Sequence, residues 1–265
     1  MSAPAHESVL DRREQARLGD IAALVPDSAE SLLDAGAREG KLAGMLVDRI
    51  KRVVALDLNP PTTPDARVES VAGDITALEY RDDAFDVVVC SEVLEHIPVG
   101  KLSGACRELC RVARSSVVVG VPYRQDLRCA RTLCANCHRR NPPYGHVNSF
   151  TEEDLISLFP ECVPVALSYI GSSRERTNSV SSALMDFAGN PYGTYHQDEC
   201  CVHCGAQIGP PAPRSFVQKV ATRAALWIDR AQRALTPARA RWLHVRFDKS
   251  GARGAKPAVR RISVA

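Results

Sequence analysis

The sequence predicts a doubly wound α/β domain built on a parallel sheet, and three observations support this prediction. Between residues 31 and 121, apolar runs of strand length alternate with segments of helical periodicity. The runs over 85–90 and 115–121 read as strands that are covered on both faces, as parallel strands are. Glycine and acidic residues stand at the ends of several runs, at the sheet edge where such folds bind ligands.

The elements follow from residue type and spacing. Apolar residues recur at helical spacing in the first helix, which Pro26 ends. The run after the crossover helix is rich in β-branched residues and stops at the sequence N-P-P-T-T-P. In order, we predict a helix over 8–24, a strand over 31–35, a crossover helix over 40–50, strands over 51–58, 68–72 and 85–90, a helix over 101–112, and strands over 115–121 and 164–170.

Length and composition fit one large domain, or one domain with appendages. The chain has 265 residues, of which 45% are hydrophobic and 25% charged. It contains no apolar run near the ~20 residues that a membrane-spanning helix needs. Its first residues lack the apolar core of a signal peptide, so we expect a cytoplasmic location, where disulfides are rare. Ten cysteines, several in close pairs, then favour a metal site over a disulfide framework.

Charge is unevenly distributed along the chain, although the net charge is only +3. Residues 211–265 hold 13 Lys and Arg against 2 acidic residues, whereas residues 1–210 hold 21 against 29. The basic segment begins with an amphipathic helix predicted over 215–235, and 251–265 is expected to be disordered. Such a helix is a candidate for contact with an anionic membrane surface, for binding RNA backbone, or for packing on its own domain.

Four polar segments follow the predicted strands and are expected to converge at one edge of the sheet. The first is L-D-A-G-A-R-E-G over 33–40, which reads as a strand, a glycine turn and a helix start. In the second, A-L-D-L-N, Asp57 ends a strand, and the third is the G-D-I sequence that contains Asp74. The fourth is S-E-V-L-E-H-I over 91–97, directly after a buried strand. Together they predict a ligand site at the carboxyl ends of the strands.

In this order the four segments resemble the motifs of class I S-adenosylmethionine-dependent methyltransferases, from Ser31 to about Pro122 and again over 146–170, about half of the chain. One departure is Arg38, which stands at the middle glycine of that family's first motif, where a side chain restricts positive φ. The resemblance implies a Rossmann-like sheet and S-adenosylmethionine as cofactor. The cofactor-binding residues that it implies are Asp34, Gly36, Gly40, Asp57, Leu58, Asp74, Ile75, Cys90 and Ser91.

The acceptor side is predicted from the residues after the fourth strand and from a second histidine. A hydroxyl acceptor needs a base to remove its proton, and His96 is the best-placed base in the sequence. Glu95, beside it, and His146 are the other catalytic candidates. The stretch Y-G-H-V-N-S-F resembles one found in small-molecule and sugar methyltransferases. The residues expected to hold the acceptor are Tyr123, Tyr144 and Asn148.

Two pairs of cysteines predict a structural zinc site. Each pair has the C-x-x-C spacing, and the second pair is followed by Gly205, which relieves the turn. Four thiolates close the coordination sphere of zinc, so the metal would be structural and not catalytic. The predicted ligands are Cys134, Cys137, Cys201 and Cys204, with Cys129, His138, Cys200 and His203 as competing ligands that spacing does not exclude.

The predicted organisation is an N-terminal helix over 1–27, an α/β domain over 28–124 and 146–170, a cysteine-rich lid over 125–145 and 171–210, and a basic helix with a flexible tail over 211–265. The predicted function is an S-adenosylmethionine-dependent O-methyltransferase for a small or carbohydrate-type acceptor, linked to polysaccharide or lipid. The basic helix is a candidate for peripheral membrane contact. The alternatives are an RNA methyltransferase, which the zinc site and basic tail favour, and an inactive binding protein, which Arg38 favours.

Overall fold

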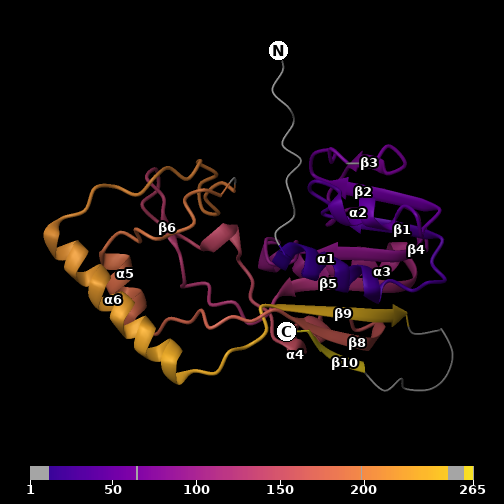
Figure 1. Ribbon diagram of the computed structural model, residues 1–265. Helices are drawn as coiled ribbons and strands as arrows, with labels where there is room; N and C mark the ends of the chain where they lie inside the picture. Colours follow the sequence, from indigo (N-terminus) through magenta and orange to yellow (C-terminus); the bar gives the residue numbers. More distant parts are fainter. Residues whose placement is uncertain (1–11, 64, 198, 250–259, 265) are drawn as a thin grey trace, which may run out of the picture.

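The computed structural model describes residues 12–63, 65–197, 199–249 and 260–264. Its centre is an eight-stranded sheet in the order β10-β8-β9-β5-β4-β1-β2-β3 (Figure 1). The strands are β1 (Ser31–Ala35), β2 (Arg52–Asp57), β3 (Glu69–Ala72), β4 (Phe85–Ser91), β5 (Ala113–Pro122), β8 (Cys162–Ile170), β9 (Trp242–Lys249) and β10 (Arg260–Val264). The doubly wound α/β prediction is confirmed, because β1 to β5 pair in parallel with the order reversing between β1 and β4.

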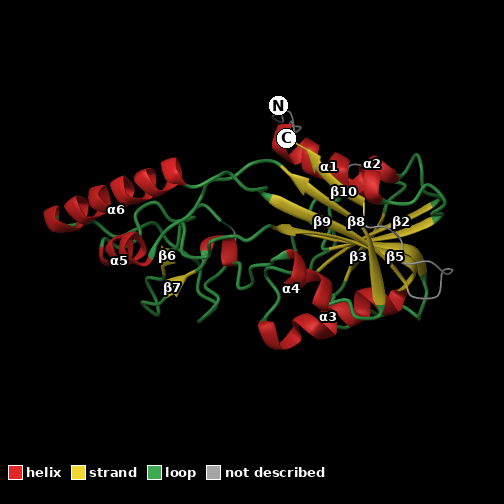
Figure 2. Cartoon of the chain, turned by 90° about the horizontal axis from the view of Figure 1, so that it is seen from below, coloured by secondary structure: helices red, strands yellow, loops and turns green. Residues whose placement is uncertain are grey.

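Helices cover both faces of the sheet. α1 (Arg12–Leu24) and α2 (Lys41–Leu46) lie on one face, and α3 (Val99–Val112) and α4 (Glu152–Ser157) on the other (Figure 2). α3 buries the apolar stripe that its spacing predicts, with Leu109 fully buried. α2 ends at Leu46, four residues before the predicted end, and the chain then turns toward β2.

The C-terminal part of the chain corrects the prediction that 211–265 holds only a basic helix and a flexible tail outside the α/β domain. β9 lies antiparallel between β5 and β8, in the middle of that half of the sheet. It alternates apolar and polar residues, and Leu243, Val245 and Phe247 have no exposed surface. His244 points to the other face, where its Nδ1 lies 2.6 Å from the Asp20 carboxylate of α1. The high density of basic residues around this strand hid the alternation in the sequence.

The predicted disordered tail is corrected in part. Residues 260–264 form β10, which pairs in parallel with β8 at the sheet edge. The rest of that segment, 251–259 and residue 265, lies outside the described residues. The predicted N-terminal helix also extends outside them, over residues 8–11. Its described part, α1, packs into the core through Leu18 and Ile21, so it belongs to the α/β domain.

The cysteine-rich lid stands beside the sheet and not on top of it (Figure 1). It contains β6 (Thr132–Leu133), β7 (Arg140–Asn141), a 3-10 turn over Pro143–Gly145 and α5 (Ser179–Phe187). α6 (Phe216–Leu235) packs on α5, with Asn178 Nδ2 donating to Gln232 Oε1 at 2.9 Å, so this helix belongs with the lid. Among the described helices, none combines the length and the apolar character needed to cross a bilayer.

Candidate functional site

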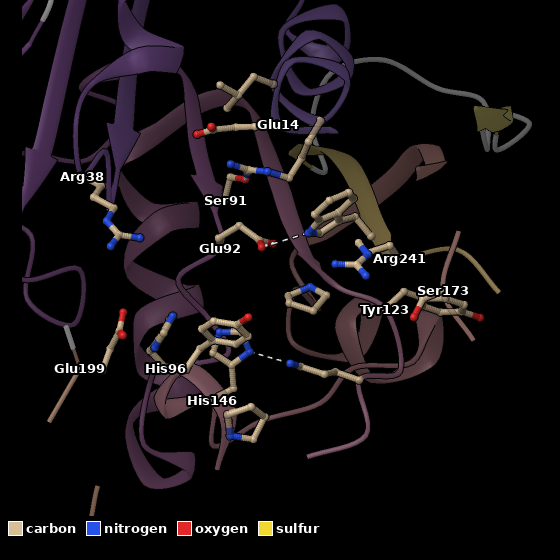
Figure 3. A pocket seen from close by; sticks show the side chains of 18 of the residues that line it. Glu14, Arg38, Ser91, Glu92, His96, Tyr123, His146, Ser173, Glu199 and Arg241 are labelled. Atoms are coloured by element: carbon tan, nitrogen blue, oxygen red, sulfur yellow. Dashed lines mark hydrogen bonds between the residues drawn. The ribbon is translucent and has the colours of Figure 1, made fainter. Parts of the chain in front are cut away.

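A cavity of about 530 Å³ opens between the carboxyl ends of β1, β4 and β5 and the cysteine-rich lid (Figure 3). Such an edge is the usual ligand site of a doubly wound sheet. The structure therefore brings together residues from the first motif, the fourth motif and the lid, which lie up to 165 residues apart in the chain, from Asp34 to Glu199. The predicted site residues that line it are Asp34, Gly36, Ser91, His96, Tyr123, Tyr144 and His146.

The glycine turn after β1 is packed so closely that its two glycines leave no room for a side chain. Gly36 has φ +88°, and a Cβ on it would lie 2.1 Å from Cγ2 of Val93. Gly40 has φ +64° and caps α2, close to Thr63. Arg38 adopts the same left-handed conformation, with φ 50°, and its backbone N–H donates to Oδ2 of Asp57 at 2.8 Å. The turn thus keeps a glycine-like path despite the arginine, at a cost of about 1 kcal/mol.

Asp34 is a buried carboxyl at the floor of the cavity. It is 3% exposed, and burial raises its pKa to about 7, against the opposing influence of the Ala43 backbone N–H and of Arg17. Arg17 comes from α1 and donates to Oγ of Ser91 at 2.8 Å. No motif in the first helix marked Arg17, so sequence reasoning missed it. The cavity floor thus pairs a guanidinium with a carboxyl that titrates near neutral pH.

We expect Asp34→Asn to stabilise the free protein at pH 8 and to weaken ligand binding at the floor. A carboxyl whose pKa is raised on folding contributes most to stability below its unfolded pKa, and that contribution is lost as pH rises through about 7. The variant should therefore gain up to about 4 kcal/mol over the wild type at pH 8 and little at pH 4. Urea unfolding at both pH values measures this, with the exposed Asp27→Asn as control. Equal gains at the two pH values would contradict the assignment.

Four of the residues predicted to bind the cofactor, Asp57, Leu58, Asp74 and Ile75, lie at or just after the ends of β2 and β3, outside the described lining of the cavity. Oδ2 of Asp57 accepts from Arg38, Oδ1 accepts from the Leu58 N–H at 2.7 Å, and each oxygen keeps a second lone pair. Leu58 is 72% exposed, so an apolar surface stands free beside that carboxylate. Asp74 is exposed and accepts from the Thr76 N–H at 2.8 Å, while Ile75 is buried beneath it.

Three further predicted residues, Cys90, Asn148 and Glu95, also lie away from the cavity wall. Cys90 has no exposed surface and belongs to the core, where burial raises the pKa of its thiol well above the usual range. Asn148 uses Nδ2 to donate to the backbone oxygens of Leu94 and Ile97, at 2.9 and 2.6 Å, so it holds the loop after β4 instead of facing an acceptor. Glu95 is completely buried behind His96, and burial raises its pKa well above the usual range.

The two predicted histidines meet at the acceptor side of the cavity. Their ring centroids are 4.6 Å apart with the planes nearly perpendicular (Figure 3). His146 Nδ1 lies 2.6 Å from Oε1 of Gln125, and because that oxygen only accepts, Nδ1 carries the proton and Nε2 keeps a lone pair. Burial lowers the pKa of His96, and burial with the neighbouring His96 lowers the pKa of His146 to about 3. His146 is therefore uncharged at neutral pH.

The remaining wall includes Glu92, from the fourth motif, and residues from segments that carried no recognisable motif. Glu92 has φ 58°, and its Oε2 accepts from the Trp242 indole at 3.0 Å (Figure 3). Trp242 is the first residue of β9, which the sequence did not reveal as a core strand, and Arg241 directly precedes it. Glu199 from the cysteine-rich lid faces the same space as His96 (Figure 3). The alternating polarity over 242–249 is the signal that could have predicted a strand there, and with it the position of Trp242 and the preceding Arg241.

The four predicted zinc ligands come together in the cysteine-rich lid. All four Sγ atoms lie within 4.8 Å of one another, with 3.7 Å between Cys134 and Cys204 and between Cys137 and Cys201. Four sulfurs bound about 2.3 Å from one zinc ion are about 3.8 Å apart, so the set fits tetrahedral zinc.

Both loops of the cluster share one backbone pattern. The N–H of His138 donates to the oxygen of Cys134 at 3.0 Å, and that of Gly205 to the oxygen of Cys201 at 2.9 Å. These two donors both have positive φ, at 54° and 70°, which explains the glycine in the second loop. Of the competing ligands, none joins the four described thiols: Cys129 lines the cavity, Cys200 and His138 are exposed, and His203 lies 2.9 Å from the oxygen of Arg140.

Comparisons with known proteins agree with this geometry. Residues 33–119 match the family described as "Methyltransferase domain". The chain is 38% identical over 95 residues to malonyl-[acyl-carrier protein] O-methyltransferase from Serratia marcescens, which covers 34% of this chain and 36% of that protein. It is 35% identical over 82 residues to ribosomal RNA small subunit methyltransferase A from Geobacter metallireducens, covering 28% and 29%. The chain thus spans less than half the length of the curated relatives that it matches.

Solved structures share the fold over most of the chain. The YcgJ protein from Bacillus subtilis superposes with a TM-score of 0.54 at 14% identity, covering 90% of this chain and 100% of that one. At that identity the likeness concerns the fold alone. The family match covers β1 to β5, the strands that carry the glycine turn and the S-E-V-L-E-H-I segment. Residues 33–119 therefore match a methyltransferase domain, on the doubly wound sheet predicted from the resemblance to class I S-adenosylmethionine-dependent methyltransferases.

Proposed function

We propose that the protein transfers a methyl group from S-adenosylmethionine to a hydroxyl of a small or carbohydrate-type acceptor. One observation carries this proposal: the same cavity is lined by Asp34 and Gly36 of the glycine turn and by His96 and His146. A methyl transfer needs the donor and the acceptor-activating groups in one space, since the displacement is in line and depends on positioning. The identity of the acceptor as polysaccharide- or lipid-linked is part of the proposal.

The described residues fit the proposed cofactor. Gly36 lines the cavity with backbone alone, because a Cβ there would clash with Val93, and the Arg17 guanidinium suits a methionine carboxylate. The lone pairs of Asp57 suit the ribose diol, and the exposed side chain of Leu58 offers an apolar contact for adenine. Bound S-adenosylmethionine supplies an electrophilic methyl group. The residues of the chain would hold that group and exclude water from the cavity between the sheet edge and the cysteine-rich lid.

The acceptor would enter between the histidines and two tyrosines. Tyr144 is 51% exposed at the cavity mouth, and Tyr123 lies deeper, edge to face with Tyr169. Phenol groups donate and accept hydrogen bonds and present an apolar face, as sugar hydroxyls and ring carbons require. His96 and His146 would activate the hydroxyl that receives the methyl group.

The decisive experiment is a transfer assay with tritiated S-adenosylmethionine over glycan, lipid and RNA fractions. We expect label in a glycan or glycolipid fraction, with loss of label for His96→Ala and His146→Ala. If no glycan or lipid is labelled, calorimetry with the cofactor and the RNA fraction of the assay distinguish the two alternative functions. No cofactor binding would support an inactive binding protein, whereas label in RNA that weakens steeply with salt would support an RNA methyltransferase.

We also propose that the four clustered cysteines of the lid hold one structural zinc ion.

We further propose that α6 contacts an anionic membrane surface. The buried side of α6 carries small residues, Ala221 and Ala225 among them, against α5. Large apolar side chains point away, with Phe216 80% and Trp227 72% exposed. The helix's one acidic residue, Asp229, is buried. The basic residues of α6 are Lys219, Arg223, Arg230 and Arg233.

We expect vesicles of phosphatidylcholine with phosphatidylglycerol to bind the protein, and neutral vesicles to bind it weakly. Removing two exposed apolar side chains in Phe216→Ser with Trp227→Ser should weaken sedimentation at least about tenfold, because each buried side chain contributes about 1.5–3 kcal/mol. Val99→Ser is the control, since Val99 is 73% exposed on a different helix. Binding that is equal on both lipids, or unchanged in the double variant, would contradict the proposal.

A further inference from the structure

Three side chains beside the cavity form a cluster of metal-ligand type. One ligand atom each from Glu95, His96 and His146 lies within 4.8 Å of the other two. The first two follow β4 and the third precedes α4, so the cluster joins the sheet to the segment that closes the acceptor side. Two imidazoles and a carboxylate are a frequent ligand set for divalent transition ions.

The carboxylate of Glu95 has no partner among the described residues. Its side chain has no exposed surface, and neither Oε1 nor Oε2 makes a hydrogen bond. A buried carboxyl without partners costs several kcal/mol, so native structures seldom keep one unless a ligand completes it. This orphaned group points to a cation that the described side chains alone do not supply.

The backbone fixes the cluster from both sides. The oxygen of Glu95 accepts from the N–H groups of Val147 and Asn148, at 2.7 and 3.1 Å. The Asn148 side chain adds two bonds to the loop that carries His96. Gln125 holds Nδ1 of His146 and leaves Nε2 free to bind, as outer-shell partners of metal-binding histidines do. The three ligands are thus positioned by contacts that do not depend on one another.

We propose that Glu95, His96 and His146 bind one divalent first-row transition ion, with its open positions facing the cavity. Two ligands that are each about 2.1 Å from an ion lie at most about 4.2 Å apart. The observed limit of 4.8 Å therefore needs an inward shift of roughly half an ångström, within reach of a carboxylate rotation. His96 and His146 both line the cavity, so an acceptor oxygen can reach the open side.

The role of this ion rests on the proposed methyl transfer. A divalent ion that binds the acceptor hydroxyl lowers its pKa, so the hydroxyl proton passes to water. The alkoxide oxygen then forms a bond to the methyl carbon while the sulfur–methyl bond breaks. The electron pair stays on sulfur, which becomes an uncharged thioether. His96 and His146 would thus act through the ion and not as proton acceptors.

The test is Mn²⁺ binding to the zinc-loaded full chain, followed by the electron paramagnetic resonance signal of free Mn²⁺. We expect one equivalent bound in the wild type, and pulsed spectra that show two imidazole nitrogens on the bound ion. Glu95→Gln, His96→Asn and His146→Asn should each weaken binding about 10- to 100-fold or more. His138→Asn is the matched control, because that exposed histidine belongs to the cysteine-rich lid and lies outside the cluster.

Wild-type protein that binds no Mn²⁺, or bound Mn²⁺ without imidazole nitrogens, would overturn the proposal whether or not the variants fold. Equal affinity in the wild type and the three variants would do the same. The proposed methyl transfer is tested separately from the ion site. Mn²⁺ bound at these residues without methyl transfer to any fraction would leave the ion site standing, and methyl transfer without Mn²⁺ binding would leave only the enzyme.

Discussion

Gly36→Ala should abolish measurable binding of S-adenosylmethionine, with a loss of affinity of at least about 100-fold. The added Cβ would lie 2.1 Å from Cγ2 of Val93, a distance that packed atoms do not tolerate. The residue also has φ +88°, where an alanine costs about 1–2 kcal/mol. Relief requires Val93 to move, and Val93 belongs to the loop that carries Glu92 and His96 along the cavity. Isothermal calorimetry with the cofactor measures the loss.

The matched control is Gly100→Ala. Gly100 lies in the first turn of α3, and a Cβ there meets nothing within 4 Å. Alanine should stabilise that helix by about 0.4–1 kcal/mol and leave cofactor affinity unchanged. Melting temperatures of both variants separate a local effect from unfolding. If Gly36→Ala binds the cofactor within threefold of Gly100→Ala, the turn does not form the proposed cofactor site.

The part of the site that the sequence predicted is the part built from consecutive residues. The glycine turn and the S-E-V-L-E-H-I segment each follow a strand directly, so their place at the sheet edge follows from the order of elements. Arg38 looked like an obstacle from its residue type. Its φ of 50° and its bond to Asp57 show that the backbone keeps the glycine path, which no sequence rule states.

What could not be predicted depends on contacts between distant segments. Trp242 and Arg241 reach the cavity only because β9 inserts beside β5, and a basic segment with one short alternating run gave no reason to place it there. The environment of Glu95 is similar. Its lack of any partner follows from the way residues 146–148 close over it, more than fifty positions away in the chain. The sequence shows that residue 95 is a glutamate, but it does not show that its carboxyl group is buried without a hydrogen-bond partner.

Cys201→Ser should release the proposed zinc ion and open the cysteine-rich lid, while the sheet stays folded. Cys201 is 2% exposed and its thiol lies 3.7 Å from that of Cys137, across the two loops that the ion would join. Apart from the ion, the described residues hold the cluster through a small apolar core around Ile208 and a few hydrogen bonds, such as that from the Val202 N–H to Oδ1 of Asn141 at 2.8 Å. Because binding of structural zinc contributes about 10–16 kcal/mol to folding, the loss of one ligand should remove most of the order in the lid. Bound zinc should fall from one per chain to nearly none.

Cys200→Ser separates the effect of the ligand from the effect of changing a cysteine. Cys200 is the preceding residue, is exposed and lies outside the four-thiol cluster, so this variant should keep its zinc. Limited proteolysis should cut Cys201→Ser within 125–145 and 190–210 and leave Cys200→Ser intact. The two chains should share the same far-ultraviolet signal from the sheet. Glu199 and Tyr144 reach the cavity from this lid, so loss of zinc should also remove methyl transfer to the acceptor while cofactor binding at the glycine turn persists. Full zinc content in Cys201→Ser would show that Cys201 is not a required ligand, and proteolytic resistance in a Cys201→Ser chain that has lost its zinc would show that the lid is held by packing and not by a metal.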